Sequence, residues 1–163
     1  MKILHITAPG ERPGSKPLAD EFPSAEVEQV DIFNLLTLEP GSADLVYCAF
    51  ALPVVPAGEV PRTIQQMTAV LADRGELWLV TPALEWCAQQ ILSDNPNPAV
   101  HTALFGERDK PYRCGFTLAW LRALIEEAGL IPRKMTQGVY AMQIGEHGTQ
   151  LPCNIAIGWK VLQ

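Results

Sequence analysis

Residues Ser42–Pro82 read SADLVYCAFALPVVPAGEVPRTIQQMTAVLADRGELWLVTP, and this stretch decides the fold. It begins with Ala43–Ala49, a short apolar run typical of a strand buried on both faces. From Val60 onward the apolar residues recur at the spacing of one helix face. The stretch closes with Glu76–Thr81, a second apolar run that ends at a proline. Because a strand, a helix and a strand follow one another, the stretch predicts a βαβ unit.

Further strands are predicted on both sides of this unit. Lys2–Ala8 alternates and ends at a Pro-Gly pair, and Glu26–Asp31 alternates as well. Arg133–Tyr140 and Asn154–Leu162 are typical of an antiparallel pair, joined through the glycines of residues 145–148. Two right-handed crossovers place the first strand centrally, parallel to the strands of the βαβ unit.

Three helices are predicted with defined ends. The first starts near Val60 and stops at Asp73–Gly75, where helix-ending residues cluster. Leu84–Leu92 forms the second. Leu118–Ala128 is the third, with Thr117 as its N-cap and a stripe of apolar residues for the core.

Several residues stand where a known family has them. Asp44 near a strand start, Leu71 and Gly75 at a helix end, and Pro82 at the next strand end follow one order. This order resembles the middle of the class I S-adenosylmethionine-dependent methyltransferases, especially their small-molecule branch. The segment RCGFTLAWLRALIEEAGL (113–130) is similar to that family's next helix and its lead-in. The resemblance extends over most of the chain.

The resemblance implies an α/β fold, a three-layer sandwich of the Rossmann-like methyltransferase type, in a single domain over residues 1–163. Its sheet is expected to be mostly parallel and to end in a C-terminal antiparallel hairpin. The interval from Gly10 to Ser42 has room for one strand and a short helix candidate at Pro17–Glu21. Because the family has two strands with a helix between them there, one N-terminal βα unit is expected to be missing.

The resemblance also implies S-adenosylmethionine as cofactor and methyl transfer to a small molecule. In such a sheet the ligand lies at the carboxyl ends of the strands, where the strand order reverses. The predicted lining follows three strands and comprises Thr7, Ala8, Pro9, Gly10, Asp31, Ile32, Phe33, Cys48, Ala49 and Phe50. Methyl transfer requires mainly alignment from the protein, so the catalytic residues stay unassigned.

The turn after the first strand departs from the family pattern. Thr7, Pro9 and Glu11 stand where glycines belong. Glycine permits a positive φ and close approach of the backbone to a ligand, and these residues do not. Either Gly10 and Gly14 build a displaced loop, or the cofactor is not held in the usual manner. We therefore expect S-adenosylmethionine to bind weakly or not at all.

Asp31, at a strand end, has two interpretations that the sequence leaves open. By resemblance its carboxylate hydrogen-bonds the ribose or lies beside the adenine, with Ile32 and Phe33 forming an apolar slot. Alternatively it caps the short turn at Ile32–Leu36, as Asp commonly does.

Charge and composition exclude several classes of function. The formal charge is −6, and no cationic cluster is longer than Arg133–Lys134, which argues against nucleic acid as the partner. A small-molecule or protein substrate is favoured. No apolar run approaches the roughly 20 residues of a membrane span. Four widely spaced cysteines without a Cys-x-x-Cys pair favour buried, reduced thiols and a cytoplasmic location.

The histidines give little support to a metal site or a catalytic base. His5, His101 and His147 have no neighbours at metal-ligand spacing, so no metal is expected. His5 stands in the place of an acidic residue of the family's first turn. His101 lies in a polar insertion at 99–112, a region that often covers the substrate site in the family. It is either a general base or simply solvated.

Two functions remain after these exclusions. One is a methyltransferase acting on a small molecule, which the resemblance implies. The other is a degenerate, non-catalytic member of the same fold that serves as a binding or assembly module, which the altered turn after the first strand favours.

We predict a homodimer, because the missing βα unit leaves an edge of the sheet exposed beside Asp31. Unpaired backbone groups and apolar side chains on such an edge favour self-association. Sedimentation velocity over a range of protein concentrations is expected to show dimers. A monomer at high concentration would contradict this prediction.

Overall fold

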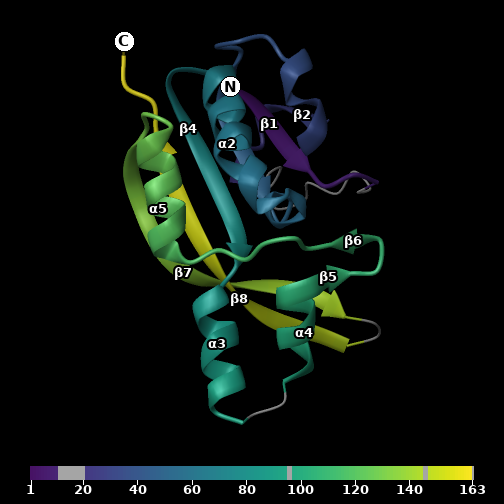
Figure 1. Ribbon diagram of the computed structural model, residues 1–163. Helices are drawn as coiled ribbons and strands as arrows, with labels where there is room; N and C mark the ends of the chain where they lie inside the picture. Colours follow the sequence, from purple (N-terminus) through teal and green to yellow (C-terminus); the bar gives the residue numbers. More distant parts are fainter. Residues whose placement is uncertain (11–20, 95–96, 145–146, 163) are drawn as a thin grey trace.

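The computed structural model describes residues 1–10, 21–94, 97–144 and 147–162, and a six-stranded sheet runs through it (Figure 1). The spatial order is β2-β1-β3-β4-β8-β7. The first four strands are parallel to one another, and β8 is antiparallel to both of its neighbours, β4 and β7. The strands are β1 (Lys2–Thr7), β2 (Glu26–Asp31), β3 (Ala43–Ala49), β4 (Leu71–Pro82), β7 (Ile131–Ile144) and β8 (His147–Trp159). The prediction of a mostly parallel sheet with a C-terminal antiparallel pair is confirmed.

The first strand lies inside the sheet, as the sequence predicts. β1 pairs in parallel with β2 on one side and β3 on the other, with Ile3 opposite both Val27 and Leu45. The backbone N–H of Lys2 donates to the Asp44 carboxylate at 2.7 Å, which joins β1 to β3 at the amino ends of the strands. Asp44 therefore has a structural role at the amino ends of these strands.

The N-terminal part of the sheet is short. Residues 32–42, all of them described, contain the 3-10 turn η1 (Ile32–Thr37) and no strand. β2 is therefore the last strand on this side of the described sheet. Its Glu26 and Glu28 are exposed, and Glu28 pairs with Lys2 at 3.0 Å. Charged side chains on an edge strand oppose further strand pairing, so a dimer through this edge stays a prediction.

Two helices cover one face of the sheet, α2 (Val60–Val70) and α5 (Leu118–Glu127) (Figure 1). Both contribute to the main hydrophobic core, which includes Ile64 and Met67 of α2 and Leu121 of α5. The predicted N-cap of α5 is confirmed, because the Thr117 hydroxyl accepts a hydrogen bond from Trp120 N at 3.1 Å.

The end of α2 differs from the prediction. The helix ends at Val70, and Leu71 already pairs with Ala43 as the first residue of β4. The Lys160 ammonium donates to the carbonyls of Leu71 (2.6 Å) and Thr68 (3.3 Å). A cation from far along the chain thus adds hydrogen bonds at the end of α2, where the Thr68 carbonyl also accepts from Leu71 N–H, and local sequence gives no sign of it.

A second group of elements lies below the carboxyl ends of the parallel strands in Figure 1. It contains α3 (Leu84–Leu92), α4 (Pro98–Phe105), the hairpin of β5 (Gly106–Glu107) and β6 (Lys110–Pro111), and the far halves of β7 and β8. Its small core is Cys87, Ala103 and Leu151. The region predicted as a polar insertion at 99–112 thus forms a helix and a hairpin.

Two short 3-10 turns, η2 (Leu52–Val54) and η3 (Ala57–Glu59), connect β3 to α2. The opposite face of the sheet carries aromatic side chains, with the Trp78 ring 6.0 Å from Phe22 and 6.4 Å from Tyr47. The short helix predicted at Pro17–Glu21 lies outside the described residues except for Glu21. None of the described helices has the length and apolar character needed to cross a bilayer.

We predict that Gly75→Ala destabilises the protein by about 1–3 kcal/mol, because a Cβ there lies 2.9 Å from the Ala72 carbonyl oxygen and 3.1 Å from that of Asp44. The control is Gly58→Ala, where a Cβ meets nothing within 4 Å. Urea denaturation of both variants measures the difference. Equal stabilities would contradict the close packing of β4 against β3 at this point.

Candidate functional site

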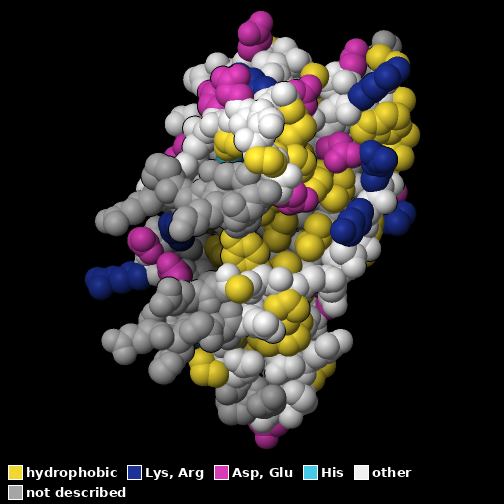
Figure 2. All heavy atoms as spheres, turned by 180° about the vertical axis from the view of Figure 1, so that it is seen from behind, with side chains coloured by type: hydrophobic (Ala, Val, Ile, Leu, Met, Phe, Trp, Pro, Cys, Tyr) yellow, Lys and Arg dark blue, Asp and Glu magenta, His cyan; other side chains and the backbone are white. Residues whose placement is uncertain are grey.

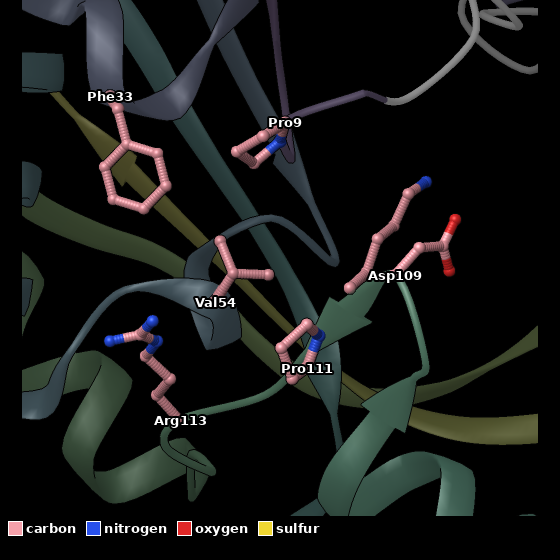
Figure 3. Close-up of a pocket in the computed structure, with 7 residues that line it drawn as sticks. Pro9, Phe33, Val54, Asp109, Pro111 and Arg113 are labelled. Carbon is pink, nitrogen blue, oxygen red and sulfur yellow. The ribbon is translucent and has the colours of Figure 1, made fainter.

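A hollow of about 130 Å³ opens at the carboxyl ends of the parallel strands (Figure 3). One wall comes from the segments that follow β1, β2 and β3, and the other from the β5–β6 hairpin and the chain beyond it. The lining residues are Pro9, Phe33, Val54, Asp109, Lys110, Pro111 and Arg113. Figure 2, which views the molecule from behind, shows apolar side chains exposed across its middle, between the upper and lower parts. Four lining residues are apolar and three are charged, so the site is mainly apolar.

The end of β1 presents backbone and few side chains to this hollow. Thr7 is only 4% exposed, and its hydroxyl accepts from Gln29 Nε2 at 3.3 Å and contacts the Val30 carbonyl at 3.4 Å. Ala8 is buried, whereas Pro9 and Gly10 are exposed. Gly10 has φ +74°, a left-handed conformation that favours glycine. One glycine of the displaced loop therefore has the backbone that such a turn requires, and Gly14 lies outside the described residues.

Asp31 caps the turn that follows β2. Its Oδ1 accepts a hydrogen bond from Phe33 N at 2.9 Å, so the capping interpretation of this residue is confirmed. The cap uses one carboxylate oxygen. Because Asp31 is half-buried and pairs with Thr7 in the sheet, the carboxylate lies at the strand ends near the hollow.

The other predicted residues divide between the core and the surface. Ile32 and Cys48 are packed in the main core, and Ala49 is buried in a smaller cluster with Val80. Phe33 is 54% exposed and lines the hollow. Ile32 therefore does not face the hollow together with Phe33, and only Pro9 and Phe33 of the ten predicted residues line it.

Phe50 has an unusual backbone conformation at the end of β3. Its φ is +58°, which is rare for a residue with a side chain. Phe50 N donates to the Val80 carbonyl at 2.8 Å, and its ring packs edge-on against Tyr140 at 4.7 Å. These contacts hold the chain where it leaves β3 for η2, which forms part of the hollow.

Sequence reasoning named none of the residues in the second wall of the hollow. Arg113 N donates to the Pro53 carbonyl at 2.7 Å, and the Cys114 thiol contacts the Val55 carbonyl at 3.3 Å. These contacts fix the chain after β6 against η2. The family resemblance indicated 99–112 as a region that often covers the substrate site, but neither it nor the polar character of the segment says which side chains face a cavity.

A buried polar network holds the lower elements to the sheet. Asn154, 0% exposed on β8, donates through Nδ2 to Glu85 Oε2 at 2.8 Å and to the Phe116 carbonyl at 2.9 Å. Glu85 Oε1 in turn accepts from Leu118 N at 2.7 Å, at the first turn of α5. A carboxylate at a helix N-terminus is favourable, because the amides there point outward. The network therefore joins β8, α3 and α5.

The described residues contain little that is suited to covalent catalysis. Burial raises the pKa of the Cys114 thiol to about 11, so this thiol stays protonated at neutral pH. Burial also raises the pKa of Cys87 and Cys153. No group of three or more metal-ligating side chains exists in the described part of the chain. His101 is exposed, and its ring lies 4.9 Å from that of Phe105.

Solved structures with a similar arrangement of elements include methyltransferases. A candidate methyltransferase from Bacillus halodurans matches with a TM-score of 0.66 at 14% identity, over 99% of this chain and 92% of that one. An S-adenosylmethionine-dependent methyltransferase from Methanosarcina mazei matches with a TM-score of 0.62 at 18% identity, over 99% and 93%. The chain thus has the Rossmann-like fold of the class I S-adenosylmethionine-dependent methyltransferases.

A third structure includes ligands. The 1,6-didemethyltoxoflavin-N1-methyltransferase of Burkholderia thailandensis, solved with 1,6-didemethyltoxoflavin and S-adenosylhomocysteine bound, matches with a TM-score of 0.58 at 14% identity. The match covers 98% of this chain and 71% of that chain. No protein-family model matches the sequence, and a search of curated proteins finds no relative. Identities this low establish the fold alone.

We predict that Asn154→Leu lowers the free energy of unfolding by about 2–4 kcal/mol, because it removes two hydrogen bonds of a buried amide, one of them to the half-buried Glu85 carboxylate. Gln150→Leu, on the exposed part of the same strand, is the matched control. Urea denaturation measures both. Neutral surface substitutions change stability by up to about 0.5 kcal/mol. If the two variants differ by less than this, the network is dispensable for stability.

Proposed function

We propose that this protein transfers a methyl group from S-adenosylmethionine to a small molecule, and that it holds the cofactor weakly. One observation carries the proposal: the hollow lies at the carboxyl ends of β1 and β2, beside the left-handed turn at Gly10. Ligands of doubly wound sheets bind at the carboxyl ends of the strands, where the strand order reverses. The methyltransferase fold of the whole chain supports the choice of cofactor.

The residues present fit the cofactor in part. Gly10 would let the backbone approach it, and Asp31 would face the ribose with the oxygen that does not cap η1. The hollow of about 130 Å³ is small beside the roughly 300–1,000 Å³ of ligand pockets. Losing backbone contacts worth a few kcal/mol turns a micromolar site into a roughly millimolar one.

The chemistry asks little of the side chains. When bound, the sulfonium supplies a methyl group that is already activated. The protein's part is to align the acceptor and to exclude water. The β5–β6 hairpin and the chain to Arg113, fixed on η2 by hydrogen bonds to Pro53 and Val55, are placed to do both.

The alternative is a non-catalytic binding module of the same fold. It is favoured by the small size of the hollow and by the replacement of turn glycines with Thr7 and Pro9. In this case the hollow would bind a ligand without methyl transfer.

Calorimetric titration with S-adenosylmethionine and S-adenosylhomocysteine separates the two functions. We predict binding in the range of about 0.1–10 mM, lost in Asp31→Ala because both the turn and the ribose contact depend on this carboxylate. Asp73→Ala is the control. It removes an exposed carboxylate at the amino end of β4, away from the hollow, and retains binding. Micromolar binding that survives Asp31→Ala would contradict the proposed site, and no binding at 10 mM would favour the module.

A further inference from the structure

We propose that the small molecule bound by this hollow is a flat, one-ring carboxylic acid whose carboxylate pairs with Arg113. Its role as the methyl acceptor rests on the proposed function, whereas its recognition rests on the residues of the hollow alone.

The apolar part of the hollow fits one ring. Phe33 is 54% exposed, and Pro9, Val54 and Pro111 add three more apolar surfaces around the same space (Figure 3). The hollow measures about 130 Å³. An apolar cavity of about 150 Å³ binds benzene, so the described space accommodates a single aromatic ring. Burying the exposed face of Phe33 against such a ring is favourable.

The charged part of the hollow selects an anion. Two cations, Lys110 and Arg113, and one carboxylate, Asp109, line it. In Figure 3 the side chains of Val54 and Pro111 lie between Arg113 on one side and Asp109 on the other. The Asp109 carboxylate is thus not positioned to neutralise the Arg113 guanidinium.

Arg113 is exposed and makes no ion pair with the described residues, whereas two other arginines do. Arg122 pairs with Glu126 at 3.7 Å, and Arg133 pairs with Glu76. Over the residues that the structure describes, the Arg113 guanidinium has no such partner, although its backbone N–H is fixed on the Pro53 carbonyl at 2.7 Å. A guanidinium presents a planar fork of donors that matches a carboxylate with two parallel hydrogen bonds. Arg113 thus combines a fixed backbone with a guanidinium that is available for hydrogen bonding beside an apolar surface, as a carboxylate site requires.

Titration with benzoate and its uncharged analogue benzamide, followed by ligand-observed and ¹⁵N NMR, tests this assignment. Wild type is expected to bind benzoate at least about tenfold more tightly than benzamide, since a charged hydrogen-bonded pair is worth about this factor or more. Arg113→Gln should reduce benzoate binding to the level of benzamide. Arg122→Gln, the matched control, should leave both unchanged. Phe33→Ala should weaken both ligands.

Equal binding of the two probes by wild type, or full benzoate binding by Arg113→Gln, would overturn the proposal. A second titration adds saturating S-adenosylhomocysteine. Benzoate that stays bound supports an acceptor site, and benzoate that is displaced would overturn it, because the anion site would then belong to the cofactor's amino-acid end. If S-adenosylhomocysteine does not bind but benzoate binds through Arg113, recognition of the acid is confirmed and the proposed function fails.

Discussion

One buried amide connects the parts of this protein that build the site. Asn154 of β8 donates to Glu85 of α3 and to the carbonyl of Phe116, and Glu85 accepts from the first turn of α5. These groups are far apart in the sequence and meet where β8 runs beside β4. Because buried polar groups are costly without partners, this arrangement of the three elements is favourable for the Asn154 amide nitrogen and for the Glu85 carboxylate, although the buried Asn154 Oδ1 has no partner among the described residues. The chain that leads into α5, which contains Arg113, is positioned as a result.

The parts of the fold that the sequence predicts are those determined by local patterns. The alternation of β1, the apolar run of β3 and the N-cap Thr117 each act within a few residues, and all appear as expected. The early end of α2 was not predictable, because it depends on Lys160, about ninety residues away along the chain. The helix α4 and the β5–β6 hairpin were missed for a related reason, since their small core includes Leu151 of β8.

The candidate site was predicted less well than the fold. The position at the carboxyl ends of the strands follows from topology, and Pro9 and Phe33 do line the hollow. Which way a side chain points at a strand end depends on packing, so Ile32 turned out to be a core residue. The second wall belongs in part to the insertion at 99–112, which the resemblance places near the substrate site, but Arg113 lies just beyond it and no sequence pattern assigns that side chain to the site. The left-handed Gly10 shows how a turn that lacks the family's glycines still keeps one such residue.

The central claim is that the hollow between the strand ends and the β5–β6 hairpin is the ligand site of this methyltransferase fold. Chemical-shift mapping with S-adenosylhomocysteine, raised to about 10 mM, tests it most directly, because shifts report weak binding residue by residue. We expect the amide signals of Gly10, Asp31 and Phe33 to move together along one saturation curve, since the Phe33 amide donates to the Asp31 carboxylate. Shifts confined to the amino ends of the strands, around Asp44 and Gly75, or no shifts at all, would contradict it.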